Sequence, residues 1–160
     1  MSTRLALLVV LAGCSGLRGG AASPAAPAPV ALSAATPPVT FVRSTAESRV
    51  TRTIDVRDGL THAQAMRTLI DALGQRYTVD VADPRAGFVM TTWQAPLSDG
   101  VPDLRYRTRV TARFQGDDWK KLQVRGEANW VRGEEWDVGY DAAQLDSATG
   151  DLRAKLGKRQ

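Results

Sequence analysis

The chain has 160 residues, of which 43% are hydrophobic and 24% charged, and it carries a formal net charge of +4 with a pI near 9.6. This composition is that of a globular protein and excludes a chain that is disordered throughout. The basic excess is smaller and less clustered than is typical of nucleic-acid-binding domains, so we expect no nucleic-acid partner.

Residues 1–13 have the layout of a secretory signal. Arg4 supplies a positive charge, an apolar run "LALLVVLA" follows, and small residues come after it. The run is too short to span a bilayer, which needs about 20 apolar residues. The string "LAGC", which ends at Cys14, resembles the lipobox of bacterial lipoproteins. This resemblance implies that the signal is removed, that the Cys14 sulfur is alkylated with diacylglycerol and that its new amine is acylated.

The residue that follows Cys14 indicates in which membrane the lipoprotein is held. Ser15, rather than Asp, resembles the outer-membrane sorting pattern of Gram-negative lipoproteins. We therefore expect a protein held by the lipid on Cys14 at the periplasmic face of the outer membrane. The alternative is a cytosolic or plainly secreted chain with a stray thiol. Disulfides play no part in the domain that follows, because it contains no other cysteine.

Residues 14–40 are rich in Ala, Gly, Pro and Ser, and Arg18 is their only charged residue. Such a segment cannot bury enough apolar surface to offset its ordering entropy, so it is predicted to be a disordered tether. The alternative is that "APVALS" within it forms a strand on the domain. The folded domain is expected over residues 41–160.

The domain is predicted to begin with a strand and a helix. Residues 51–56 alternate between apolar and polar side chains, as a strand does. Thr61 and Gln64 have the spacing of a capping box and predict the start of a helix. The apolar residues of this helix at helical spacing are Met66, Leu69, Ile70 and Leu73. Gly74 follows them where a C-cap glycine belongs.

Four further strands and a second helix are expected. Residues 77–81 and 88–93 flank the turn "ADPRAG" and predict a hairpin. Residues 104–114 and 121–130 alternate between apolar and polar side chains and predict a second hairpin with one apolar and one polar face. The apolar residues that fit a second amphipathic helix, interrupted by Gly150, are Leu145, Leu152 and Leu156.

The predicted order is strand, helix, four strands, helix. One-sided strands of this kind favour an α+β fold: a single antiparallel sheet of about five strands, with both helices packed on its apolar face. The opposite face is then left to solvent or to a partner.

Two stretches resemble a known family. These are "AMRTLIDALGQRYTVDVADPRAGFVMTTWQ", residues 65–94, and the following "LRYRTRVTARF". They resemble the helix-grip domains of the BamC (NlpB) lipoproteins in the order of helix, hairpin and arginine-rich strand. The resemblance covers residues 50–130 and implies a non-enzymatic lipoprotein of outer-membrane protein assembly or of another envelope complex. The chain has room for one such domain, where BamC has two.

The sequence contains few residues of the types that catalyse reactions or bind metals. His62 is the only histidine and is expected at the first turn of the helix rather than in a catalytic role. A Cys/His metal cluster is excluded by the number of these residues. The acidic run with Glu134, Glu135 and Asp137 suits a hard cation or paired-carboxylate chemistry, or it is a solvated loop. We expect no enzyme and no cofactor.

The polar face of the second hairpin is strongly basic. The candidate residues for binding an anion or a partner are Arg105, Arg107, Arg109, Arg113, Lys121 and Arg125. Lys121 and Arg125 are expected across from the arginines, an arrangement of like charges that lowers stability unless Glu127 or an anionic partner offsets it. A solvated face is the alternative. The candidate aromatic residues near the end of this hairpin, as core and rim or as a ligand platform, are Trp130, Trp136 and Tyr140.

The sequence therefore favours a non-catalytic envelope lipoprotein that scaffolds or modulates an outer-membrane protein complex. The alternative is a binding module for an anionic envelope component, such as lipopolysaccharide or phospholipid headgroups, that acts through the arginine-rich face.

Overall fold

The computed structural model describes residues 36–44 and 50–158. The predicted signal, Cys14 and most of the predicted tether lie outside these residues. The helices and strands are β1 (Phe41–Arg43), β2 (Thr51–Asp55), α1 (His62–Gly74), β3 (Val79–Asp83), β4 (Phe88–Thr91), β5 (Leu97–Ser98), β6 (Val101–Pro102), β7 (Tyr106–Gln115), β8 (Lys121–Arg132), β9 (Glu135–Asp141) and α2 (Ala142–Leu156).

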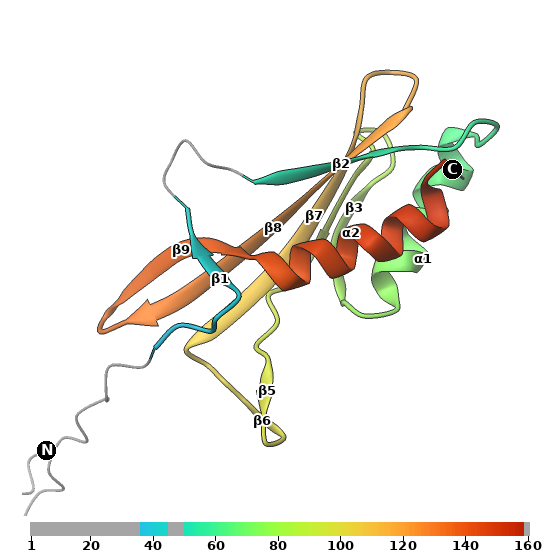
Figure 1. Ribbon diagram of the computed structural model, residues 1–160. Coiled ribbons are helices and arrows are strands. Elements are labelled where there is room, and N and C mark those ends of the chain that lie inside the picture. The colour runs from blue at the N-terminus through green and yellow to red at the C-terminus, as the bar shows by residue number, and fades with distance from the viewer. Residues whose placement is uncertain (1–35, 45–49, 159–160) are drawn as a thin grey trace, which may run out of the picture. The chain divides into compact units, whose positions relative to one another are not determined.

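Over the described residues the fold is α+β, with two helices and an open antiparallel sheet of seven strands (Figure 1). The strand order is β1-β9-β8-β7-β4-β3, and β2 pairs with β8. The long strand β8 lies at the centre. It pairs with β7 along one edge, while its other edge is shared by β2 over residues 121–125 and by β9 over residues 128–132.

The hydrophobic core lies on one face of this sheet. Alternate residues of β7 and β8, such as Val110 and Leu122, are fully buried there. Leu69 of α1 and the leucines Leu145 and Leu152 of α2 belong to the same core cluster. Both helices therefore pack on the apolar face of the sheet, as the one-sided strand pattern predicts, and α2 runs across the strands beside α1 (Figure 1).

The first helix begins as the sequence predicts. The Thr61 side chain accepts a hydrogen bond from the Gln64 backbone N–H, and the Gln64 side chain accepts one from the Thr61 N–H, at 3.2 and 2.9 Å. The prediction for Gly74 is wrong, because this glycine is the last helical residue and Gln75, in right-handed helical geometry, is the C-cap. None of the helices in the described part of the chain is long and apolar enough to cross a membrane.

The second helix starts on a buried carboxylate. Asp141 is the N-cap of α2 and accepts a hydrogen bond from the Gln144 backbone N–H at 2.8 Å. It also accepts bonds from the Tyr106 hydroxyl at 2.7 Å and the Thr40 hydroxyl at 2.8 Å. Gly150 does not interrupt the helix, which continues through it to Leu156. One side chain thus joins the segment before β1, the start of β7 and the helix.

The expected number of about five strands is wrong, because β1 and β9 extend the sheet beyond β8 and a small hairpin, β5–β6, precedes β7. In β9 the side chains of Trp136 and Val138 point away from the core and are 40% and 56% exposed, whereas Gly139 and Asp141 are buried. Strand β9 is not predicted from the sequence, because its buried positions carry a glycine and an aspartate while these two apolar side chains are exposed. Leu104, expected in the strand, lies before β7 and is exposed.

Candidate binding surface

No helix that the structure describes covers the face of the sheet opposite α1 and α2, and we call it the exposed sheet face. Its strand positions alternate with the buried ones, so the sequence pattern of β7 and β8 assigns them. The members on these two strands are Arg107, Arg109, Thr111, Arg113, Gln115, Lys121, Gln123, Arg125, Glu127, Asn129 and Val131. Most of the predicted basic residues therefore lie together on one surface, next to Trp93, Trp136 and Val138.

The register of β7 and β8 corrects one expectation. Lys121 pairs with Gln115 and Arg125 with Thr111, so neither stands directly opposite an arginine of β7. Arg109 instead faces Glu127. The predicted direct opposition of like charges is wrong, because the register places a carboxylate at the centre of the basic residues.

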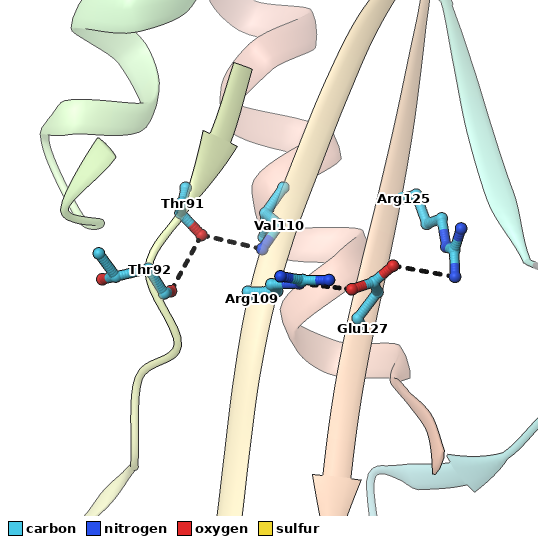
Figure 2. Close-up of polar contacts among 6 residues, drawn as sticks. All are labelled: Thr91, Thr92, Arg109, Val110, Arg125 and Glu127. Atoms are coloured by element: carbon cyan, nitrogen blue, oxygen red, sulfur yellow. Dashed lines mark hydrogen bonds and ion pairs between the residues drawn. The ribbon is translucent and has the colours of Figure 1, made fainter. Parts of the chain in front are cut away.

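Glu127 neutralises two of the arginines. It forms ion pairs with Arg109 and with Arg125, the latter at 2.9 Å, and it lies between them in Figure 2. Its side chain is only 15% exposed, so water screens these pairs less than it screens an exposed pair. The cluster stabilises the sheet face and removes two cations from those available to a ligand.

Arg105 is neutralised in a different place. It precedes β7, and its guanidinium bonds the Asp103 carboxylate at 3.0 Å. The Arg105 side chain, and next its backbone N–H, lower the pKa of Asp103 below its ordinary value. This exposed local pair occupies the Arg105 guanidinium, while the Arg105 backbone carbonyl accepts a hydrogen bond from the Val131 N–H at 2.8 Å.

Arg107 and Arg109 meet two tryptophans in what we call the Trp–Arg cluster, made of Trp93, Arg107, Arg109 and Trp136. The Arg107 guanidinium carbon lies 4.8 Å from the ring centre of Trp93 and 4.4 Å from that of Trp136. The Arg109 guanidinium carbon lies 4.5 Å from Trp93. These distances are within the range of cation–π attraction. The cluster therefore holds two guanidinium groups in place on an uncovered surface.

A local irregularity after β4 turns Trp93 toward this cluster. Met90 pairs with Thr111 and Gln94 with Thr108, so four steps along one chain oppose three along the other. The Thr91 hydroxyl accepts a hydrogen bond from the Val110 N–H at 3.0 Å where this extra residue is accommodated (Figure 2). One extra residue reverses the side on which the following side chains lie. Trp93 thus reaches the exposed sheet face although Val89 and Thr91 are buried on the other.

The remaining basic residues lie at the other end of the exposed sheet face. Arg113 and Lys121 are exposed and form no ion pair within the described part of the chain. An open pocket of about 340 Å³ lies beside them. Its lining residues are Thr51, Phe88, Thr111, Arg113, Gln123 and Arg125.

The aromatic residues predicted as one group are separated by the fold. Trp130 is buried on the helix side with Tyr106, Ala128 and Phe41. Trp136 stands on the opposite face, and Tyr140 is half-buried against the main core. Trp136 alone of the predicted trio is therefore part of the candidate surface.

Other candidates lie apart from this face. His62 is the exposed first residue of α1 and stacks on Trp119 with 4.3 Å between ring centres. In the acidic run, Glu134 and Glu135 are exposed, while Asp137 forms ion pairs with Arg43 and Arg132. The described residues contain no group of three or more His, Cys, Asp or Glu side chains that could hold a metal ion.

Sequence reasoning missed Trp93 and Val138 as members of the surface. Strict alternation assigns Trp93 to the buried side, and only the extra residue in its strand reverses this. No protein-family model matches this chain, and neither does any curated protein.

Proposed function

We propose that this protein is a non-catalytic envelope lipoprotein that binds a partner protein through the exposed sheet face and so scaffolds or modulates an outer-membrane protein complex. The Trp–Arg cluster is the observation that supports this proposal. Tryptophan and arginine are the side chains most enriched where binding energy concentrates in protein interfaces. Here two of each gather on a face that neither helix covers.

The surroundings of the cluster support a protein partner. Trp136 and Val138 are 40% and 56% exposed beside each other on β9, and Val131 pairs with Trp136 on the neighbouring strand. Single exposed apolar residues are normal, whereas a group next to ordered aromatic rings marks an interaction surface. Polar and charged side chains away from the apolar residues, such as Gln123 and Arg125, resemble the rim of an interface.

The fold is consistent with the family resemblance. Two helices on one face of an antiparallel sheet are the arrangement expected of a helix-grip domain, and we propose that this domain is BamC-like. In this proposal the helices close the core and the free face of the sheet receives the partner.

The proposed anchor is the lipid on Cys14. We expect Cys14→Ser to prevent incorporation of radiolabelled palmitate and to release the protein from the membrane fraction, because the acyl chains supply the membrane affinity. Equal labelling and fractionation of the two proteins would contradict the lipoprotein assignment. Ser15→Asp, with the lipid intact, is expected to move the protein from the outer to the inner membrane.

The second candidate function is binding of an anionic envelope component. It is favoured by the open pocket that Arg113 and Arg125 line. Guanidinium groups suit phosphate and carboxylate oxygens. Binding by this route would weaken steeply with salt, because the cations involved are exposed.

The test is crosslinking in cells with a photo-reactive amino acid at position 138, on the exposed sheet face. The matched control has the same amino acid at position 67, an exposed site on α1. We expect one dominant protein adduct at position 138, which Trp136→Ala abolishes, and none at position 67. Adducts that are mainly lipid or polysaccharide would contradict a protein partner at this surface and favour the second function. No adduct at position 138 would refute the binding of a partner protein there.

A further inference from the structure

Resting on the function above, we propose that the partner presents an acidic segment to the exposed sheet face and that Arg107 binds a side-chain carboxylate of that segment. In the Trp–Arg cluster, Arg107 has aromatic neighbours but, among the described residues, no anionic partner. Arg107 contacts two indole rings but forms no hydrogen bond or ion pair through its guanidinium with any residue that the structure describes.

The two rings prepare Arg107 for a planar anion. Stacking engages the flat faces of a guanidinium and leaves the N–H groups, which lie in the plane, free of the rings. The Nε of Arg107 is buried without a hydrogen-bond partner among the described residues, so the donors open to a ligand are the terminal Nη groups. Trp93 approaches from the β4 side of β7 and Trp136 from β9, beyond β8. A carboxylate that meets the free N–H edge gains two parallel charge-assisted hydrogen bonds, and the side chain does not have to be ordered at that moment.

The charges around Arg107 favour one carboxylate over a phosphate-rich surface. Arg109 and Arg125 already share Glu127, and Arg105 is bonded to Asp103. In the described part of the chain, the cations left on this face are Arg107, Arg113 and Lys121. A membrane or a polysaccharide that presents many phosphates would find few unpaired cations to bind.

The apolar neighbours indicate that the carboxylate belongs to a protein. Trp136, Val131 and Val138 lie beside Arg107 and leave apolar surface exposed. A lipid headgroup layer offers no apolar group at the level of its phosphates. An Asp or Glu flanked by apolar side chains matches both the charge of Arg107 and its surroundings.

The test uses the full lipidated chain in nonionic detergent, with ¹⁵N-labelled arginine, and observes the Arg107 Nε–H resonance by NMR. The probe is the tripeptide acetyl-Leu-Glu-Leu-amide, and its matched control is acetyl-Leu-Gln-Leu-amide. We expect the Glu peptide to shift this resonance in a saturable manner, and the Gln peptide to bind about tenfold more weakly because it lacks the charge. This comparison needs no variant of the protein.

Two variants distinguish a specific role of Arg107 in peptide binding from a general effect of positive charge. Binding to the variants is followed through the indole N–H resonances of Trp93 and Trp136, in protein with ¹⁵N-labelled tryptophan. Arg107→Lys is expected to weaken binding of the Glu peptide about tenfold, because an ammonium group can neither stack nor form the planar pair. Arg67→Gln removes one positive charge from the exposed side of α1, away from the exposed sheet face, and is expected to leave binding of the Glu peptide unchanged.

Other results would overturn the proposal. Equal binding of the Glu and Gln peptides, or an Arg107 resonance that neither peptide shifts, would show that no carboxylate binds there. A larger effect of inorganic phosphate, or of phosphatidylglycerol added to the micelles, would assign the residue to phosphate groups, free or in lipid. A crosslinked adduct at position 138 that survives Arg107→Gln would keep the partner-binding function and refute only the role of Arg107.

Discussion

Asp141 connects three parts of the chain that are far apart in the sequence. Its carboxylate accepts hydrogen bonds from the backbone N–H of Gln144 and from the hydroxyls of Tyr106 and Thr40. Three donors satisfy the buried charge, which would otherwise be costly to remove from water. One side chain thereby caps α2 and joins it to the sheet.

We expect Asp141→Ala to lower the free energy of unfolding by about 3 kcal/mol, because it removes a helix cap and leaves the Tyr106 hydroxyl without its acceptor. Urea unfolding followed by circular dichroism measures this loss. Asp146→Ala is the control: it removes a carboxylate of α2 whose ion pair with Arg52 is exposed, and is expected to cost less than about 0.5 kcal/mol. Equal losses would show that the buried network contributes little.

The same network predicts a dependence on alkaline pH. Burial, and next the hydrogen bond to Asp141, raise the pKa of Tyr106 above its ordinary value of 10.0. The stability contributed by the protonated hydroxyl is therefore present below about pH 10 and is lost as pH rises toward the folded pKa, by up to about 1.4 kcal/mol per pH unit. We expect Tyr106→Phe to reduce this slope in urea titrations from about pH 9 to about pH 11.

Tyr77 serves as the comparison in that experiment. Burial raises its pKa too, so it adds a separate contribution that Tyr77→Phe measures. If Tyr106→Phe leaves the alkaline slope of the wild-type protein unchanged, the loss of stability comes from other groups.

At the scale of elements, β9 and β1 show how a sheet edge forms without an apolar pattern. Gly139 pairs with Arg43 of β1, and a Cβ at Gly139 would stand 2.2 Å from the Val42 carbonyl oxygen and 2.8 Å from the Phe41 ring. Only a hydrogen side chain lets these two strands approach. The edge is thus specified by close backbone packing, with little burial of apolar side chains.

We expect Gly139→Ala to destabilise the protein by more than about 2 kcal/mol, because neither a carbonyl oxygen nor a strand can move cheaply. Amide hydrogen exchange should show β1 losing protection first. Gly150→Ala is the opposite case: no atom lies within 4 Å of the added Cβ, and α2 should gain about 0.5–1 kcal/mol. If Gly139→Ala is as stable as the wild-type protein, β1 is not held against β9 in this way.

At the scale of the whole molecule, the two helices cover one face of the sheet and leave the other exposed, so the two faces have different roles. The helix side holds the core, from Leu69 of α1 to Leu152 of α2. The other side is exposed and carries the Trp–Arg cluster and Glu127. The charge that matters for a partner is the pattern of paired and unpaired cations on this face, which differs from the net charge of the chain.

This view predicts that Glu127→Gln strengthens binding to an anionic polymer. The change frees Arg109 and Arg125 next to Arg113, so the variant is expected to elute from a heparin column at clearly higher salt than the wild-type protein. Glu134→Gln makes the same change of net charge in an exposed turn. If the two variants elute together, net charge alone governs binding and the pairing on the sheet face is unimportant.

The sequence by itself determined the elements whose signals are local. The capping box at Thr61, the apolar stripe of α1 and the alternation of β7 and β8 predicted a helix and a hairpin that the structure contains. They also placed Arg107, Arg109 and Arg125 on one face, because side chains alternate strictly along a strand. The predicted lipid anchor depends only on residues 1–15. The signal and the lipobox are short local patterns, and they are recognised without any knowledge of the fold.

Only the tertiary structure decided how strands pair across the chain. The register between β7 and β8 set Glu127 opposite Arg109, and β9 brought Trp136 to the surface that Arg107 occupies. An extra residue after β4 moved Trp93 to the same face. Register and irregular pairing arise from contacts between distant segments, so alternation along one strand cannot reveal them. The Trp–Arg cluster exists only because three such long-range choices agree.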